Sequence, residues 1–243
     1  MNRGCHRKAT NEQAIAKAFA AASAPHVILV GRRLEKLDQV KEHISREFTS
    51  CKVHCFSADV SNASSVEKMF DEILANGLQV DVLINNAGIN DARTPIADSN
   101  PDNWWRNYVR PCHSISITWI GPYANEHQEV MVKGPFVCTR AFFRQRKSIT
   151  TSGAVIMVSS VGSYATLPNA SSYGSAKAAL NRFTEWVGVE GKDHNIHAVA
   201  FHPGGVAGTE LTSSSPEHLQ RLFTENGYGS SLIASVHKRF LGQ

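Results

Sequence analysis

Tyr173 and Lys177 stand four positions apart in the stretch SSYGSAKAALNRF, which has the composition of a helix. This spacing places a phenol and an ammonium group on the same helical face. A nearby cation favours the phenolate and lowers the pKa of a tyrosine, so the hydroxyl becomes usable as a general acid or base. Because such a pair alone is usually an ordinary pair on a helix surface, the chemistry requires a third group.

Ser160 supplies that third group. It lies thirteen positions before Tyr173, at the end of the apolar stretch GAVIMVSS (153–160). Open α/β sheets bind their ligands at the carboxyl ends of strands, and a hydroxyl there can hydrogen-bond a substrate oxygen and stabilise its developing charge. Ser159 is the alternative, but the alternation along the strand favours Ser160. The three residues predict proton transfer to or from a small carbonyl or alcohol substrate.

The elements that position these residues alternate between helix and strand, without a repeat or a linker. This order predicts a parallel sheet with helices on both faces. Ser61 or Asn62 can cap the third helix. We expect one α/β domain over residues 1–243, a Rossmann-like, doubly wound sheet in a three-layer α/β/α arrangement. Strands are expected at 26–31, 51–58, 80–85, 153–160 and 195–201, and helices at 11–23, 34–48, 62–75 and 172–190.

Composition narrows the class of protein further. The 243 residues are 42% hydrophobic and 19% charged, and the net charge of +4 is spread along the chain. We therefore expect no nucleic-acid partner and no membrane association, and no apolar run reaches the roughly 20 residues that span a bilayer. The scattered cysteines indicate reduced thiols in the cytoplasm. No metal is expected, because Cys51, His54 and Cys55 do not complete a tetrahedral shell. The cysteines are Cys5, Cys51, Cys55, Cys112 and Cys138.

Over residues 11–211, these motifs resemble the short-chain dehydrogenase/reductase family. Asn85-Asn86-Ala87-Gly88 follows an apolar strand and is similar to the N-N-A-G turn of that family, which approaches the adenosine ribose of the cofactor. The resemblance implies catalytic roles for Ser160, Tyr173 and Lys177, and contact between Lys177 and the nicotinamide ribose. It further implies that the cofactor is bound by Asp59, Val60, Asn86, Ala87, Gly88, Tyr173, Lys177, Pro203, Gly204, Val206 and Thr209.

The nature of the cofactor can be inferred from Arg32 and Arg33, which follow the strand at 26–31. An acidic residue there would bind a ribose 2′-hydroxyl and favour NAD. Guanidinium groups instead suit a 2′-phosphate through their charge and fork geometry, so we expect NADP rather than NAD. The alternative is that both arginines are solvated at the start of a helix. Thr209 follows Val206 by three positions, where the family normally has two.

The sequence also departs from the family pattern. No strand and no T-G-x-x-x-G-x-G turn precede the helix around 14–19, and the usual last strand is not recognisable in 230–243. We therefore expect a sheet without the usual first and last strands, and loss of a central strand leaves its neighbours unpaired. Met131 stands where the family usually has an asparagine that completes its catalytic set.

Residues 109–128 interrupt an otherwise helical stretch with two prolines and no amphipathic period. We interpret them as translated intron, because Val109 can be encoded by a codon that starts with GT and Gln128 by one that ends with AG. A surface insertion near the substrate entrance is the alternative. Since family oligomers use the helices at 102–148 and 172–190, the insertion leaves a homo-oligomer an open question.

Three hypotheses of function follow. The first is an NADP-dependent oxidoreductase that interconverts an alcohol and a ketone or aldehyde. The second is a catalytically inactive family member that serves as a binding or scaffold protein, because the glycine-rich turn is missing. The third is that this translation does not fold stably, and that a longer, correctly spliced form is the functional protein. The substrate cannot be identified from the sequence, since specificity lies in variable loops.

Overall fold

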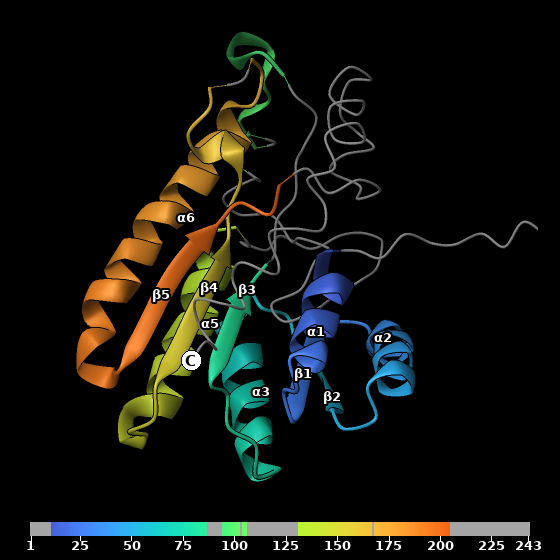
Figure 1. Ribbon diagram of the computed structural model, residues 1–243. Coiled ribbons are helices and arrows are strands. Elements are labelled where there is room, and N and C mark those ends of the chain that lie inside the picture. The colour runs from blue at the N-terminus through green and yellow to red at the C-terminus, as the bar shows by residue number, and fades with distance from the viewer. Residues whose placement is uncertain (1–10, 87–93, 103, 106–130, 167, 205–243) are drawn as a thin grey trace, which may run out of the picture.

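A computed structural model describes residues 11–86, 94–102, 104–105, 131–166 and 168–204 (Figure 1). The expected insertion at 109–128 lies outside the described residues. So do residues 1–10 and 205–243, which include the two regions where the usual first and last strands are not recognisable.

The strands of the described residues form two parallel sheets. In the first sheet β1 pairs with β2, with His26 opposite Lys52. In the second the order is β3-β4-β5, with Val82 opposite Ala154 and Gly153 opposite Ile196. The strands are β1 (His26–Gly31), β2 (Lys52–Ser57), β3 (Val82–Asn85), β4 (Gly153–Val158) and β5 (Ile196–Phe201).

Helices cover both faces of these sheets (Figure 1). On one face lie α1 (Asn11–Ala21) and α2 (Leu34–Glu47), and on the other lie α3 (Ala63–Ala75), α5 (Lys133–Gln145) and α6 (Ser171–Glu190). The expected three-layer, Rossmann-like α/β/α fold is confirmed. Short 3₁₀ helices are η1 (Ile96–Asp98), η2 (Arg146–Ser148), η3 (Val161–Ser163) and η4 (Lys192–His194).

Local chemistry explains where the helices form. The buried positions of α2 are Leu37, Val40 and Ile44, which recur at helical spacing and face the sheet. At the start of α3, the side chain of Asn62 accepts a hydrogen bond from the amide of Ser65 at 3.0 Å. Of the two expected caps, Asn62 is therefore the one that satisfies an orphan amide of the first turn.

The helix α1 contacts both sheets. Its Ala16 and Ala20 pack in the core cluster of β1, β2 and α2. Its Ile15 and Phe19 pack against a second cluster, formed by the outer-face residues Ile84, Ile156 and Val158 of β3 and β4. A third and larger cluster lies on the opposite face, between the strands and α3, α5 and α6. The two sheets therefore belong to one folded unit, although they are not hydrogen-bonded to each other.

A fully buried arginine ties the amino ends of β3 and β4 together. Arg146 is 0% exposed, and its guanidinium donates to the carbonyl oxygen of Val80 at 3.1 Å, to Oδ1 of Asp81 at 2.9 Å and to Thr151. Asp81 itself is 58% exposed at the side chain. The arginine therefore acts mainly by satisfying buried carbonyl groups rather than by forming a buried ion pair.

Charged groups link α3 to α5 at the surface. The carboxylate of Glu67 on α3 accepts from Arg140 at 2.5 Å and from Arg144 at 2.7 Å, both on α5. The hydrogen bond from Arg140 is the main reason that the pKa of Glu67 lies below its ordinary value.

Within the part of the chain that the structure describes, no helix has the length and apolar character needed to cross a membrane.

Candidate active site

Ser160 lies where β4 gives way to η3. Its side chain is half-buried, and its Oγ accepts a hydrogen bond from the amide of Gly162 at 3.2 Å, which caps η3. Ser159 is only 5% exposed, and its amide donates to the carbonyl oxygen of Phe201 on β5 at 2.8 Å. Of the two serines considered from the sequence, Ser160 is therefore the more accessible to a ligand at the carboxyl edge of the sheet.

Gly162 brings Ser160 and Tyr173 together. A Cβ atom at Gly162 would lie 3.4 Å from the Tyr173 ring and 3.6 Å from Ser160 Oγ, so this glycine stands between the two side chains. Close packing of η3 on α6 also depends on Gly174. A Cβ atom there would lie 2.8 Å from the carbonyl oxygen of Gly162, which is too close for any residue but glycine.

Lys177 occupies the same face of α6 as Tyr173. Its Nζ lies 5.9 Å from the centroid of the Tyr173 ring, as the spacing of four residues predicts. The side chain is only 3% exposed, and Nζ donates to the carbonyl oxygen of Val158 at 2.8 Å. Because Val158 is the last residue of β4, the lysine joins α6 to the strand that leads to Ser160.

A second polar contact supports this arrangement, and sequence reasoning missed it. Asn181 Nδ2 donates to Ser163 Oγ at 2.9 Å, and Ser163 Oγ donates to the carbonyl oxygen of Ser160 at 2.6 Å. The asparagine therefore fixes η3, and with it Ser160, to α6. The sequence did contain a signal for this contact, because Asn181 lies four residues beyond Lys177 in the same helix and therefore on the same face.

Trp104 is a further site neighbour that the sequence did not reveal. Its Nε1 donates to Ser171 Oγ at 2.8 Å, and Ser172 Oγ donates to the Trp104 carbonyl oxygen. These bonds hold the helical residues 104–105 against the first turn of α6, directly before Tyr173. No local pattern could indicate them, because the partners lie 67 and 68 positions apart.

The cofactor residues expected after β1 and β2 lie at the carboxyl ends of those strands. Arg32 is exposed directly after β1, and Ser57 Oγ donates to its carbonyl oxygen at 3.4 Å; Arg33 is half-buried at the N-terminus of α2. Asp59 is held at the start of α3, because its Oδ1 accepts from the amide of Ser61 at 3.0 Å. Val60, half-buried, packs against the large core cluster.

Asn86 is buried at 7% exposure directly after β3. The preceding Asn85 donates from Nδ2 to Thr139 Oγ1 at 3.4 Å, so it links β3 to α5. Pro203 and Gly204 follow β5, and Gly204 has a φ of +81°, a left-handed conformation that favours glycine. The other expected cofactor residues, Ala87, Gly88, Val206 and Thr209, lie outside the described residues.

Two further groups lie near this edge, the half-buried His202 and the fully buried Met131. Burial lowers the pKa of His202, which directly follows β5. Met131 is fully buried, at 0% exposure, just before α5. An apolar side chain suits that environment, whereas an asparagine would need hydrogen-bond partners there.

The described part of this candidate site lies at one edge of the fold. Because the strands of each sheet are parallel, the segments that follow them emerge at their carboxyl ends, which is where open α/β sheets bind ligands (Figure 1). Ser160, Tyr173 and Lys177 form the compact part of the site. Those residues expected to bind a cofactor that the structure describes after β1, β2, β3 and β5 lie along the same edge.

The short-chain dehydrogenase family model matches residues 13–220, and the chain belongs to this family. A short-chain dehydrogenase from Monascus purpureus, mpl6, is 30% identical over 210 residues, which cover 83% of this chain and 63% of that protein. The chain thus spans less than two thirds of the length of this curated relative.

Solved structures agree on the fold. A gluconate 5-dehydrogenase from Burkholderia cenocepacia in complex with NADP and tartrate matches with a TM-score of 0.69 and 23% identity, over 86% of this chain and 72% of that one. An alcohol dehydrogenase from Thermococcus sibiricus complexed with 5-hydroxy-NADP matches with a TM-score of 0.66 and 20% identity, over 88% and 84%. At these identities the likeness shows the Rossmann-like fold alone.

Proposed function

We propose that this chain is an NADP-dependent oxidoreductase that interconverts an alcohol and a ketone or aldehyde on a small-molecule substrate. One observation carries the proposal. Ser160 Oγ and the Tyr173 ring flank the same glycine, Gly162, while Lys177 Nζ lies 5.9 Å from the centroid of that ring. A hydroxyl, a phenol and an ammonium group therefore converge at the carboxyl edge of the sheet.

Each of these groups has a distinct role in the proposed reaction. In carbonyl reduction Tyr173 donates its phenolic proton to the substrate oxygen, and in alcohol oxidation it accepts that proton. Ser160 Oγ already accepts a hydrogen bond from Gly162, so its own hydrogen can be donated to the same substrate oxygen. Lys177 places its Nζ 5.9 Å from the centroid of the phenol ring, and its bond to Val158 fixes its position. When bound, NADP would supply or accept the hydride.

The residues after the strands suit such a cofactor. Arg32 presents an exposed guanidinium after β1, which fits the charge and shape of a 2′-phosphate. The positive φ of Gly204 allows the backbone after β5 to approach a ligand closely. The similar gluconate 5-dehydrogenase is in complex with NADP and the similar alcohol dehydrogenase with 5-hydroxy-NADP, which supports this choice. We assign NADP binding to Arg32, Arg33, Asp59, Val60, Asn86, Ala87, Gly88, Tyr173, Lys177, Pro203, Gly204, Val206 and Thr209.

We propose that residues 1–243 form one catalytic domain with an insertion at 109–128. The described cysteines, Cys51, Cys55 and Cys138, are free thiols, which is typical of a reducing compartment and supports action in the cytoplasm.

The test is oxidation of NADPH by the purified chain with a panel of ketones and aldehydes. Tyr173→Phe is expected to lower kcat by about 10²- to 10⁴-fold, because it removes the proton donor and leaves the ring in place. Tyr164→Phe is the matched control, since this tyrosine is 79% exposed nearby, and it should leave kcat unchanged. NADPH binding without turnover on any carbonyl would instead support the inactive binding protein.

A further inference from the structure

Two histidines from neighbouring strands meet near the amino end of the first sheet. His26 is the first residue of β1, and His54 is the third residue of β2. His26 Nδ1 lies 3.0 Å from His54 Nε2, and the two ring centroids are 5.2 Å apart. This separation allows a hydrogen bond between the rings, and it also allows both nitrogens to bind the same metal ion.

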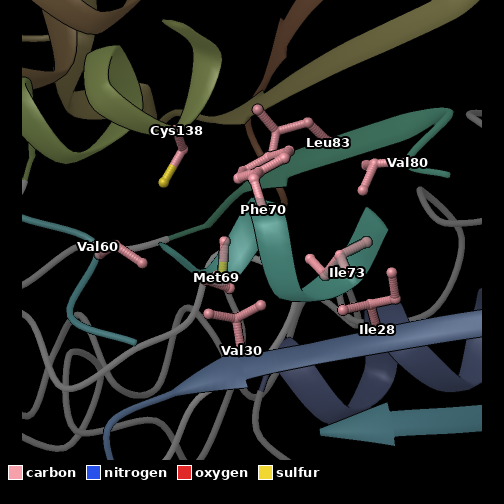
Figure 2. Close-up of a pocket in the computed structure, with 9 residues that line it drawn as sticks. All are labelled: Ile28, Val30, Val60, Met69, Phe70, Ile73, Val80, Leu83 and Cys138. Atoms are coloured by element: carbon pink, nitrogen blue, oxygen red, sulfur yellow. The ribbon is translucent and has the colours of Figure 1, made fainter. Parts of the chain in front are cut away.

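The parallel ladder determines which way the two side chains point. Successive side chains of a strand alternate between the faces of the sheet. Ile28, two residues after His26, lines an apolar pocket on the face of β1 that looks toward α3 (Figure 2). Phe56, two residues after His54, packs against the same core cluster as Ile28. His26 and His54 therefore share one face of the sheet.

The cysteines next to His54 in the sequence point the other way. Cys51 and Cys55 pack in the core cluster of β1, β2 and α2, on the opposite face of the sheet. The partner of His54 comes instead from the neighbouring strand. Among the described residues, no group of three or more His, Cys, Asp or Glu side chains could hold a metal ion. A metal ion bound between the two imidazoles would therefore complete its coordination with water.

The distance between the two nitrogens determines which ions fit. With metal–nitrogen bonds of about 2.0–2.1 Å, nitrogens 3.0 Å apart subtend an angle of roughly 95° at the ion. A tetrahedral ion has an angle of about 109° and needs a separation of about 3.3 Å, whereas square-planar and octahedral ions have angles of about 90°. The pair therefore fits Cu²⁺ or Ni²⁺ better than Zn²⁺, and imidazole is a suitable ligand for both ions.

Small adjustments bring both imidazoles into the metal-binding form. Each of the two facing nitrogens must present a lone pair, so the ring proton lies on Nε2 in His26 and on Nδ1 in His54. Rotation about χ2, which is a soft torsion in histidine, turns both lone pairs toward the ion. Because His26 is exposed and His54 is half-buried, solvent and the ion can reach the pair.

Two lysines determine the charge around the pair. Lys52 lies opposite His26 in the ladder, and Lys41 of α2 is near enough to His54 for its charge to act on it. Both lysines oppose a bound cation. Because both side chains are exposed, water and salt screen this repulsion, so it weakens the site without abolishing it.

We propose that His26 and His54 form a surface site for one divalent transition-metal ion, with Cu²⁺ or Ni²⁺ as its preferred occupants. The site is distinct from the candidate active site, because Gly31 at the carboxyl end of β1 lies five residues, or roughly 16 Å, beyond His26. A bound ion would link β1 to β2 and stabilise the folded chain.

The test is titration of the metal-free full chain with Ni²⁺ by calorimetry and with Cu²⁺ by electron paramagnetic resonance. We expect an affinity that falls at least about tenfold in His26→Asn and in His54→Asn, since each removes one of two protein ligands. In the Cu²⁺ spectrum, the splitting should change from that of two nitrogens to that of one. His43→Asn is the matched control, because His43 is an exposed histidine of α2, and it should change neither result.

Lys52→Gln gives an opposite and independent prediction. It removes a positive charge opposite His26 and keeps both ligands, so it should raise the affinity for Ni²⁺ by about two- to fivefold. If an asparagine variant fails to fold, this variant and the spectrum of the unmodified chain decide the question.

Equal affinities in the variants of His26, His54 and His43 would overturn the proposal, because the ion would then be adventitious and spread over many histidines. A spectrum of the unmodified chain with only one nitrogen, or no saturable binding, would also contradict it. None of these measurements depends on enzymatic activity, so the site and the proposed oxidoreductase can fail separately.

Discussion

Gly174→Ala is expected to destabilise the protein although alanine is a better helix former than glycine. Gly174 follows Tyr173 in α6, where the helix packs against η3. The added Cβ atom would lie 2.8 Å from the carbonyl oxygen of Gly162, which belongs to the backbone and cannot rotate away. The substitution therefore pushes η3, and Ser160 with it, away from the tyrosine.

The size of this destabilisation follows from two opposing contributions to the free energy of unfolding. Alanine in place of glycine stabilises a helix by about 1 kcal/mol, whereas overpacking a close contact costs about 1–3 kcal/mol. An ordinary carbon–oxygen contact is about 3.3 Å, so η3 must move by about 0.5 Å. The net expectation is a loss of up to about 2 kcal/mol in the free energy of unfolding. A displacement of this size is expected to lower kcat by about tenfold.

Gly188→Ala is the matched control, because Gly188 lies in the same helix and has room for a Cβ atom. The nearest atom to its added Cβ would be the Ala198 Cβ at 3.9 Å, an ordinary contact. This variant should gain about 0.5–1 kcal/mol in stability and keep its activity. Urea unfolding followed by circular dichroism measures both variants. If Gly174→Ala stabilised the protein as much as Gly188→Ala, the close packing of η3 on α6 would be refuted.

Three further predictions concern stability and reactivity. In urea titrations, Arg146→Met should reduce the free energy of unfolding by about 3–5 kcal/mol, because the arginine is fully buried. Asp81→Asn, at an exposed position, should reduce it by less than about 1 kcal/mol. Equal losses would contradict the role of Arg146 in satisfying the buried carbonyl groups. Because its pKa is lowered in the folded state, Glu67 stabilises the fold above about pH 4.5, and this contribution is lost as the pH falls further. Glu67→Gln should therefore reduce the fall in the midpoint of thermal unfolding as the pH is lowered. An unchanged fall would count against the link between α3 and α5. Burial raises the pKa of the Cys55 thiol to about 12, so iodoacetamide at pH 8 should modify it only after unfolding, and rapid modification of the native protein would disprove this.

The regular elements could be predicted because their signals are local. The strand at 26–31 matches β1 at both ends, and the helix at 34–48 ends one residue earlier in α2. The strand expected at 80–85 is shorter, because Val80 bonds instead to the side chains of Gln145 and Arg146. The strand at 153–160 ends at Val158, because Ser160 turns the chain into η3.

The site could be predicted only where its residues share one element. The spacing of Tyr173 and Lys177 was sufficient to place them on one face of α6. The hydrogen bond from Lys177 to Val158 and the contacts of Trp104 connect different elements. No periodic pattern in the sequence indicates such contacts. The roles assigned to Ser160 and to the cofactor residues remain predictions, since proximity does not measure catalysis or binding.

Thermal unfolding of the 243-residue chain in a titration with NADPH, with NADH as the control, tests the central claim most directly. A ligand that binds only the folded state raises the unfolding midpoint progressively with its concentration. We predict such a rise, larger for NADPH than for NADH, because of the exposed guanidinium of Arg32 after β1. A cooperative transition that neither nucleotide shifts would contradict an NADP-dependent enzyme, and the absence of a cooperative transition would contradict a stable fold for this chain.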